Sequence, residues 1–363
     1  MGVSYNSYLI LDEKIAVMDS VDARAADEWL AKLAHELDGR SPDYLVISHM
    51  EPDHSGSILR LAEKYQEMKL VGNTKTFTML RQFFGAKAPT DDRLLEVGEG
   101  ETLPLGAHTL HFMLAPMVHW PEVMVAYEET EKLLFSADAF GRFGALSRTA
   151  AAPWAPQARR YYYNIVGKYG AQVQALLKKA SALEIKTVCP LHGPVLTGEA
   201  LGEALRLYDL WSRWQSESPD DILLAHASIH GNTARAAELL KQKLEAKGAR
   251  VTLCDLTTTE VSYAVANAFY CGKLVLACST YDGGLFPPME EFLSHLQAKG
   301  FRSRSVGLIE NGSWAPAAAR LMRARLEEMK DLRVCGTVVS LRSALSPASE
   351  AQMDALTTEL CAE

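Results

Sequence analysis

The stretch HMEPDHSG, residues 49–56, places two histidines, a glutamate and an aspartate within a short turn of chain. It directly follows the apolar run YLVIS, which is typical of a buried strand. Because Pro52 disfavours helical geometry in the residue before it, we expect an extended loop in which His49, Glu51 and Asp53 point the same way. Imidazole and carboxylate groups gathered in this way predict a metal site.

A purely structural explanation covers only part of this stretch. A helix is expected over residues 55–66, and either Asp53 or Ser55 would serve as its N-cap. Such a cap requires no histidine, and it leaves Glu51 and His54 without a role. The metal interpretation accounts for all four ligand-type residues together.

Three more candidate ligands lie downstream, namely His119 in MVHWPEVMV, Asp138 in LFSADAFG and His192 in VCPLHGP. Each follows or interrupts an apolar run, so the end of a strand would bring it to one rim of a sheet. Taken singly, such residues are more often hydrogen-bonded structural groups. With the first cluster they complete a set of four imidazoles and three carboxylates. Four other histidines share no motif with the set and are left out of the predicted site: His35, His108, His111 and His295.

A second pattern lies at residues 228–233, where the loop SIHGNT joins the apolar run DILLAHA to a helical stretch. The hydroxyls of Ser228 and Thr233, together with backbone amides at a helix N-terminus, predict a site for an anion such as phosphate. The loop lacks the spacing and the lysine of a triphosphate-binding loop. An ordinary capped helix would present a similar pattern, so the loop alone does not identify a cofactor.

Two further loops follow strand-like runs in the same half of the chain. STYDGGLFPP, residues 279–288, follows KLVLAC, and ENGSWAPAA, beginning at Glu310, follows SVGLI. In open α/β sheets ligands bind at the carboxyl ends of the strands, so all three loops would meet at one edge.

The elements that position these residues fall into two groups. From residue 5 to about 135, short β-rich runs alternate with turns, with helical stretches near 22–38 and 55–66, which predicts a sheet-rich α+β domain. Helices are expected at 155–182 and 197–216, flanking the strand-like run KTVCPLHG.

The polar segment SESPDD at 216–221 is interpreted as a linker. After it, five strand-like runs alternate with five helical ones, which predicts a doubly wound parallel sheet. The predicted domains are therefore residues 1–216 and 221–363.

Composition narrows the class of protein. A chain of 363 residues favours two domains. A net charge of −8 without clustered Lys and Arg disfavours nucleic acid as a partner. No apolar run approaches the ~20 residues of a membrane-spanning helix, and the opening lacks the pattern of a secretory signal, so we expect a cytoplasmic protein. The six cysteines never form C-x-x-C, which disfavours zinc ribbons and rubredoxin-type iron sites.

The pattern H-x-E-x-D-H, followed by separated His, Asp and His, resembles that of the class A flavodiiron proteins. The runs YNSYLI, HWPEVMVAY, SADAFG and GLFPP extend this resemblance over nearly the whole chain. It implies a metallo-β-lactamase-like αββα sandwich carrying a diiron site, followed by a flavodoxin-like doubly wound five-stranded parallel sheet that binds FMN.

The resemblance implies roles for the predicted ligands. Hydrolases of this fold generally carry H-x-H-x-D-H and bind zinc, whereas Glu51 replaces the second histidine by a harder oxygen ligand, which favours non-haem iron. In some family members the residue matching His54 is displaced by water, so its role stays open. Trp120 either lines the pocket or belongs to the core. The two implied iron sets are His49, Glu51 and His119 on one side and Asp53, His54 and His192 on the other, with Asp138 bridging them.

The resemblance assigns the three loops of the second half to FMN. SIHGNT would hold the phosphate, and the other two loops would flank the isoalloxazine ring. The segment GSWAP is shorter than in many flavodiiron proteins, so Trp314 has either a stacking role or an unrelated one. The assigned residues are Ser228, Ile229, His230, Gly231, Asn232, Thr233, Ser279, Thr280, Tyr281, Asp282, Gly283, Asn311, Gly312, Ser313 and Trp314.

The implied activity is reduction of O2 to water, of NO to N2O, or of both, because the same ligands serve both gases in this family. Reduction of O2 to water takes four electrons and two ferrous ions supply two, so FMN would refill the pair. An external donor such as rubredoxin or a reduced deazaflavin is expected, as is a head-to-tail homodimer or a dimer of dimers. Family members usually have a further stretch before YNSYLI, so the cover of the iron pocket is expected to differ here.

Two other functions stay open on the sequence. A zinc hydrolase of the same fold with a fused flavodoxin domain would use a metal-bound hydroxide. An electron carrier with a merely structural metal site is the second alternative.

Overall fold

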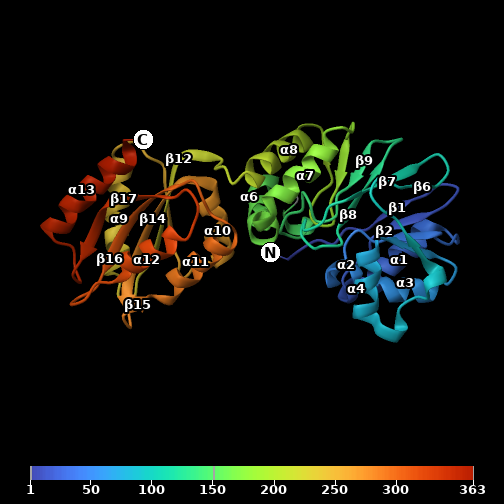
Figure 1. The fold of residues 1–363 in the computed structure, drawn as a ribbon, viewed down its shortest axis with the longest axis horizontal. Coiled ribbons are helices and arrows are strands. Elements are labelled where there is room, and N and C mark those ends of the chain that lie inside the picture. Colours follow the sequence, from blue (N-terminus) through green and yellow to red (C-terminus); the bar gives the residue numbers. More distant parts are fainter. Residues whose placement is uncertain (1, 150–151, 363) are drawn as a thin grey trace. The chain divides into compact units, whose positions relative to one another are not determined.

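The computed structural model describes residues 2–149 and 152–362. The chain divides into two compact units, Met1–Ser212 and Arg213–Glu363 (Figure 1). Helix α8 (Gly198–Ser212) closes the first unit, and strand β12 (Ser218–Ala227) opens the second.

The connection between these elements lies earlier than SESPDD indicated, because β12 already begins at Ser218. Pro219 is accommodated within this strand because the pairing register with β14 (Cys271–Tyr281) is irregular between Ser218 and Ile222. A proline at such an irregularity removes no regular ladder hydrogen bond. The segment 216–221, which we interpreted as a linker, therefore overlaps the first residues of β12.

Two sheets form the centre of the first unit. The first has the order β1-β2-β3-β4-β5, with β1 antiparallel to β2 and the others parallel. Its strands are Tyr8–Ile10, Ala16–Met18, Tyr44–Val46, Lys69–Gly72 and Leu94–Glu96. The second has the order β11-β10-β9-β8-β7-β6, in which only β9 and β10 pair in parallel. Its strands are Thr102–Pro104, Thr109–Leu114, Met124–Glu128, Leu133–Phe135, Thr187–Cys189 and Leu196–Thr197, from β6 to β11.

Helices cover the outer faces of these sheets (Figure 1). Side chains alternate along each strand, so Met18 and Val46 pack between the sheets, whereas Val17 and Leu45 pack against helices of the first sheet. The result is the expected αββα sandwich. The helices are α1 (Ala26–Leu37), α2 (Pro52–Ser55), α3 (Ile58–Lys64), α4 (Thr74–Phe84), α5 (Leu146–Thr149), α6 (Trp154–Tyr161), α7 (Gly170–Ala180) and α8.

Short helical turns complete the first unit. The helix expected over 155–182 is divided into α6, a π-helical segment, a 3-10 turn and α7. The turns are η1 (Ala23–Ala25), η2 (Gly85–Lys87), η3 (Asp91–Arg93), the π-helix η4 (Tyr162–Val166) and η5 (Gly167–Tyr169).

The second unit is a parallel sheet of five strands in the order β13-β12-β14-β16-β17, with the two-residue β15 pairing antiparallel to β14. Besides β12 and β14, its strands are β13 (Val251–Asp255), β15 (Gly284–Leu285), β16 (Ser305–Asn311) and β17 (Arg333–Leu341). Its helices are α9 (Asn232–Glu245), α10 (Val261–Tyr270), α11 (Pro287–Ala298), α12 (Ala318–Glu327) and α13 (Pro347–Cys361). Apolar residues of α9 and α13 pack on one face of the sheet, as a doubly wound fold requires.

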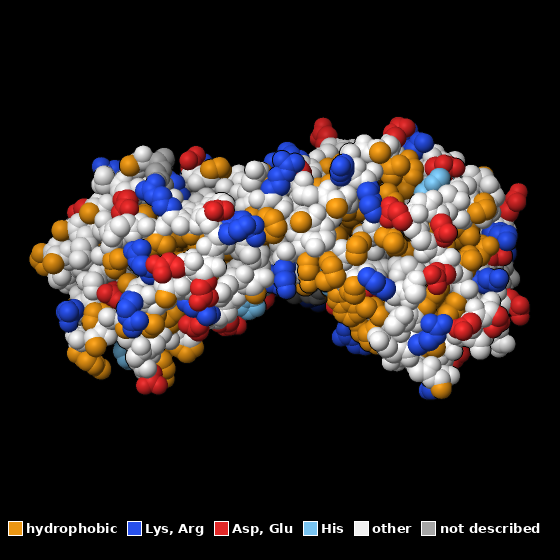
Figure 2. All heavy atoms as spheres, in the orientation of Figure 1, with side chains coloured by type: hydrophobic (Ala, Val, Ile, Leu, Met, Phe, Trp, Pro, Cys, Tyr) orange, Lys and Arg blue, Asp and Glu red, His pale blue; other side chains and the backbone are white. Residues whose placement is uncertain are grey.

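The surface shows no concentration of positive charge on the face in Figure 2. Lys and Arg side chains are interspersed with Asp and Glu over both units. That face therefore lacks a stripe of basic side chains that would attract the phosphate backbone of a nucleic acid. Among the described residues, no helix combines the length and the apolar character needed to cross a membrane.

Candidate metal and flavin sites

The first ligand set begins where β3 ends. Asp19, which follows β2, accepts hydrogen bonds at Oδ1 from the backbone N–H groups of Ser48 (2.7 Å) and His49 (3.3 Å). This fixes the chain at the strand end and directs His49 inward, where it is fully buried. Glu51 then takes an extended conformation (φ −57°, ψ 140°) as the N-cap of α2.

Four ligand atoms converge at this point. His119 Nε2 lies 3.1 Å from Glu51 Oε2 and 3.1 Å from Asp138 Oδ2. His49 Nε2 lies 3.3 Å from Glu51 Oε2 and 3.6 Å from Asp138 Oδ2. All four atoms lie within 4.8 Å of one another, which suits a single metal ion between them.

The second ligand set starts on α2. This helix begins at Pro52, so the expected extended loop ends at Glu51, and Asp53 is a helical residue rather than an N-cap. Proline is favoured at the first helical position, where its missing N–H costs nothing. Consequently Asp53 and His54 point toward His192, whose Nε2 lies 3.3 Å from Asp53 Oδ2 and 3.1 Å from His54 Nε2.

Asp138 joins the two sets. Its Oδ2 faces His119 and His49, while its Oδ1 lies 3.1 Å from His54 Nε2 and 3.6 Å from His192 Nε2. One fully buried carboxylate therefore offers one oxygen to each set. The structure brings all seven predicted residues together, with His54 Nε2 among the converging atoms.

The buried imidazoles and carboxylates perturb one another strongly. Burial lowers the pKa of His49, but its hydrogen bonds to Glu122 and Glu51 outweigh burial and raise that pKa to about 10. Burial raises the pKa of Glu51, but the hydrogen bonds of His119 and His49 lower it to about 2. Burial likewise opposes ionisation of Asp138, yet the charges of His54 and the hydrogen bond of His119 hold its pKa well below the ordinary value. The carboxylates are therefore anionic and ready to bind cations at neutral pH.

The site fits metal ions by its unpaired atoms as well as by its donors. Among the described residues, Asp53 Oδ1 and Asp138 Oδ1 are buried and accept no well-formed hydrogen bond, although His54 Nε2 lies 3.5 Å and 3.1 Å from them. Buried anionic oxygens in this state are costly unless a cation lies against them. Three or four protein ligands per set leave open coordination positions, as in catalytic rather than structural metal sites. The side chains of Glu51 and Asp53 are 35% and 26% exposed, so the carboxylate side of the site is open to solvent.

Glu122 is a functional residue that sequence reasoning missed. Its Oε1 accepts a hydrogen bond from His49 Nδ1 at 2.7 Å and from the backbone N–H of Met50 at 2.9 Å. A carboxylate on Nδ1 leaves Nε2 of His49 free to bind metal. The backbone oxygen of Glu122 is itself held by Asn73 Nδ2 (2.6 Å), and Asn73 also caps helix α4.

Two aromatic residues border the metal ligands. Tyr161 is fully buried, lies 5.6 Å from His192 between ring centroids, and has a pKa raised well above its ordinary value by burial and by the charge of Asp138. Trp120 packs edge-on against His49 at 5.2 Å between ring centroids and is only partly buried, so it borders the ligands and is not a core residue. Tyr161 carries no sequence signal, because it lies in the middle of a helical run.

A cavity of about 600 Å³ lies at the carboxyl edge of the second sheet, the volume range of cofactor pockets. It is lined by every residue that was predicted to bind FMN except Gly231 and Tyr281. Gly231 instead shapes the loop, with φ +87°, and its N–H donates to Ser228 Oγ at 3.1 Å. Tyr281 is 50% exposed and packs against Phe286.

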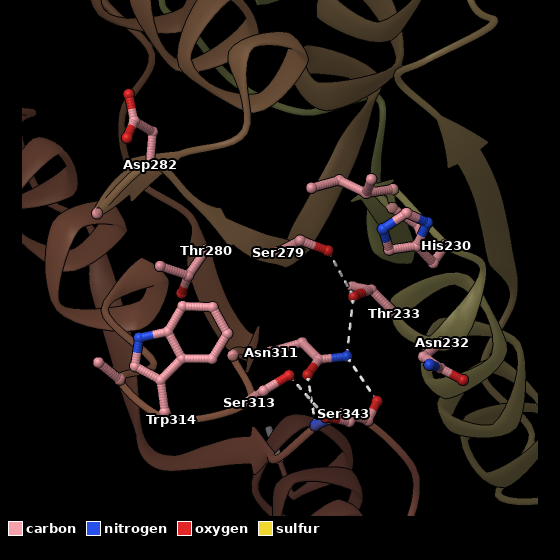
Figure 3. A pocket seen from close by; sticks show the side chains of 15 residues that line it. His230, Asn232, Thr233, Ser279, Thr280, Asp282, Asn311, Ser313, Trp314 and Ser343 are labelled. Carbon is pink, nitrogen blue, oxygen red and sulfur yellow. Dashed lines mark hydrogen bonds between the residues drawn. The ribbon is translucent and has the colours of Figure 1, made fainter.

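Hydroxyl and amide groups form a continuous network in this cavity (Figure 3). Thr233 Oγ1 lies 2.9 Å from Ser279 Oγ, and Asn311 Nδ2 donates to Thr233 Oγ1 (3.3 Å) and to the backbone oxygen of Ser343 (3.0 Å). Ser343, which follows β17, was missed by sequence reasoning, although its place at the carboxyl end of a strand is the same signal that identified the other loops.

The walls of the cavity suit a phosphorylated aromatic cofactor. Figure 3 shows the indole of Trp314 on one side and His230 on the other, and Trp314 is 87% exposed, as expected of a ring available for stacking and not of a core residue. Helix α9 begins at Asn232, so its N-terminus and the hydroxyls of Ser228 and Thr233 can hold a phosphate.

Comparison with known protein families supports the division seen in the fold. Residues 3–193 match the family described as "ODP family beta lactamase". A nitric oxide reductase of Moorella thermoacetica is 28% identical over 338 residues, covering 91% of this chain and 83% of that protein. A putative diflavin flavoprotein of Nostoc is 29% identical to this chain. That match covers 90% of this chain but only 56% of the relative.

Solved structures show the same architecture over both units. The rubredoxin oxygen:oxidoreductase of Desulfovibrio gigas has a TM-score of 0.91 at 25% identity, covering 100% of this chain and 91% of that one. The flavodiiron protein of Giardia intestinalis has a TM-score of 0.91 at 26% identity, covering 99% and 89%. The sandwich followed by a flavodoxin-like sheet is thus shared throughout the chain.

Proposed function

The chain belongs to the flavodiiron proteins, with an N-terminal domain of the ODP β-lactamase family, and we propose that it reduces O2 to water, NO to N2O, or both. The observation that carries this proposal is Asp138, whose two oxygens face two separate sets of imidazole and carboxylate groups. The cavity of the second unit would hold the FMN that such a site needs as its electron source.

The residues of this chain have distinct tasks in that reaction. Two ferrous ions, when bound, would supply open positions for a diatomic substrate and one electron each. Asp138 holds the two ligand sets together, and Glu122 orients His49. The part-exposed side of Glu51 and Asp53 leaves a path for a gas molecule. Relatives named nitric oxide reductase and rubredoxin-oxygen oxidoreductase support the two substrates and a rubredoxin-type donor.

Tyr161 is proposed to donate a hydrogen bond at this site. Its phenol stays protonated at neutral pH because burial and the charge of Asp138 raise its pKa, and Asp138 and His192 lie beside it. We expect Tyr161→Phe to lower turnover at least about tenfold, because a positioned hydrogen-bond donor to developing negative charge commonly contributes that much or more. The iron content should stay at two per chain. Steady-state gas consumption and colorimetric iron analysis measure both, and unchanged turnover would remove Tyr161 from the mechanism.

A zinc hydrolase is not favoured for this chain. Glu51 takes the position of a second histidine, and it contacts His49 and His119 as an oxygen donor. Mixed nitrogen and oxygen sets with open positions suit non-haem iron. The relatives reported above are named as oxidoreductases.

The function is tested on protein purified without oxygen. We expect two irons and one FMN per chain, and consumption of O2, NO or both when reduced rubredoxin is supplied. Removal of iron by a chelator should abolish gas consumption while the flavin is still reduced by the donor. Two zinc ions per chain and no gas consumption would instead indicate the hydrolase.

The assembly and location of the protein are further parts of the proposal. A head-to-tail homodimer would bring the flavin of one subunit to the iron pair of the other, and sedimentation of the holoprotein tests for a dimer or a dimer of dimers. A cytoplasmic location stays a prediction. The cysteines fit it, because none of the six forms a disulfide in the described part of the chain and five are buried.

A further inference from the structure

The loop that carries His192 is held by residues from the start of the chain. This loop connects β10 to β11, and His192 Nδ1 donates to the backbone oxygen of Ser4 at 2.8 Å. The backbone N–H of Gly193 donates to Ser4 Oγ, also at 2.8 Å. Gly193 has φ +86°, so this turn is open to few other residues.

Asn6 and Tyr8 fix the same loop from its other side. Asn6 Nδ2 donates to the backbone oxygens of Pro190 and Gly193, each at 2.8 Å, and the backbone N–H of Asn6 donates to the oxygen of Leu191 at 2.8 Å. The hydroxyl of Tyr8 donates to the oxygen of Pro190 at 2.6 Å. We call Ser4, Asn6 and Tyr8 the strap. The backbone of loop 190–193 is thus held mainly by residues almost two hundred positions away.

The strap determines which ring nitrogen of His192 can bind metal. A backbone oxygen only accepts hydrogen bonds, so Nδ1 of His192 must carry the proton. Nε2 then presents its lone pair toward Asp53 and His54. Loss of the strap would free both the ring orientation and the tautomer.

The other ligand set is held by different means. His49 donates to the Glu122 carboxylate, and its backbone is fixed by Asp19. Within the described part of the chain, neither His49 nor Glu122 forms a hydrogen bond with a strap side chain, whereas the charge of Asp19 acts on the hydroxyl of Tyr8. The strap and Glu122 therefore support different ligand sets, and each can be altered without touching the other.

We infer that the strap positions the second ligand set, so that loosening it releases the iron held by Asp53, His54 and His192 while the other iron stays bound. This inference rests on the diiron site of the proposed function. The strap residues are positioning residues, since they act through His192 and contact neither iron nor substrate.

A role in folding alone is the alternative explanation of these contacts. Ser7 provides a matched control, because it lies between Asn6 and Tyr8 yet its hydroxyl donates to the backbone oxygen of Asp19 instead of the His192 loop (2.8 Å). A strap that only supports the fold would make Ser7→Ala resemble Asn6→Ala and Tyr8→Phe.

The test follows release of ferrous iron from the anaerobic holoprotein to a colorimetric chelator. In Asn6→Ala and Tyr8→Phe, we expect one of two irons to leave at least about tenfold faster, as loss of a group supporting a metal ligand commonly costs 10–100-fold in metal affinity. The second iron should leave at the wild-type rate. Ser7→Ala should behave as wild type, and Glu122→Gln should accelerate release of one iron as well.

Double variants that also carry Asp53→Ala show which iron is released, because this substitution disables the second ligand set. In that background, Asn6→Ala should no longer change the release of the remaining iron, whereas Glu122→Gln should still accelerate it. The FMN content and the thermal unfolding of every variant show whether it is folded; if Asn6→Ala does not fold, Tyr8→Phe, which removes one hydroxyl, carries the test.

Equal acceleration of both irons by a strap variant, or none, would overturn the inference while leaving the proposed function intact. A wild-type protein that holds no iron would overturn the proposed function itself. These two results are distinct, because the first requires two irons in the wild type.

Discussion

Asp138→Ala is expected to abolish gas reduction, with a loss of at least about 100-fold, because one change removes a ligand from both metal sets. Without this carboxylate, the imidazoles of His54 and His192, whose Nε2 atoms lie 3.1 Å apart, keep Asp53 as a shared anion but lose the oxygen that lies 3.1 Å from His54 Nε2. Iron content should fall below two per chain. The variant is measured by O2 and NO consumption and by iron analysis, side by side with the wild type.

The FMN content of the same protein serves as an internal control. Asp138 lies in the unit Met1–Ser212, whereas the residues of the cavity at the second sheet lie in Arg213–Glu363, so the flavin should remain bound. Asp91→Ala is a matched substitution, because Asp91 has a side chain that is 85% exposed and pairs only with Arg81 on the surface. Its turnover should equal that of the wild type. Unchanged turnover of Asp138→Ala would favour an electron carrier with a structural metal site.

The metal ligands could be predicted from sequence because each of them follows or interrupts an apolar run. A strand end delivers its next polar residue to the rim of a sheet, and ligand-type residues at several such ends are rarely a coincidence. The sequence did not predict the backbone conformation between Glu51 and His54. Pro52 was correctly expected to keep Glu51 out of helical geometry, but the extended path was continued to Asp53, whereas proline is favoured at the first position of a helix and α2 begins there.

The groups that support the ligands could not be found in the same way. Glu122 pairs with His49 across 73 positions, and Ser4 pairs with His192 across 188. Neither pairing therefore produces a short motif that could be recognised in the sequence. Each depends on which strands become neighbours. Asp19 did carry a usable signal, because it follows the run KIAVM just as the ligands follow theirs.

Some helices and strands of the first unit were also not predicted, and the reason lies in their local sequence. Helix α4 was not predicted, although Asn73 is a favoured N-cap and its Oδ1 accepts from the N–H groups of Lys75 and Thr76. Strands β5 and β6 were also missed, because they lie among charged residues and glycines in DDRLLEVGEGETLPLG, where no apolar run marks a strand. In the second unit, the strand and helix alternation was long and regular, so all five parallel strands were predicted there.

Asn311→Leu is expected to lower the affinity for FMN by about 10–1000-fold, and with it turnover at limiting flavin. Asn311 is buried and forms hydrogen bonds with three groups, namely Thr233 Oγ1, the oxygen of Ser343 and the N–H of Ser343 (3.3, 3.0 and 3.0 Å). Leucine is similar in size but bonds with none of them. Leaving these groups unpaired costs about 1–3 kcal/mol each, and a combined loss of about 1.4–4 kcal/mol corresponds to about 10–1000-fold in affinity.

The measurement is quenching of flavin fluorescence as FMN is added to flavin-free protein. Gln242→Ala is the matched control, because Gln242 is an exposed residue of helix α9 in the same unit and lies outside the cavity. Iron content should remain at two per chain in both variants, since the ligands lie in the other unit. If Asn311→Leu bound FMN as tightly as the wild type, the network in Figure 3 would not be what holds the three loops around the cofactor. In that case the affinity would have to come from the N-terminus of α9 and from stacking on Trp314.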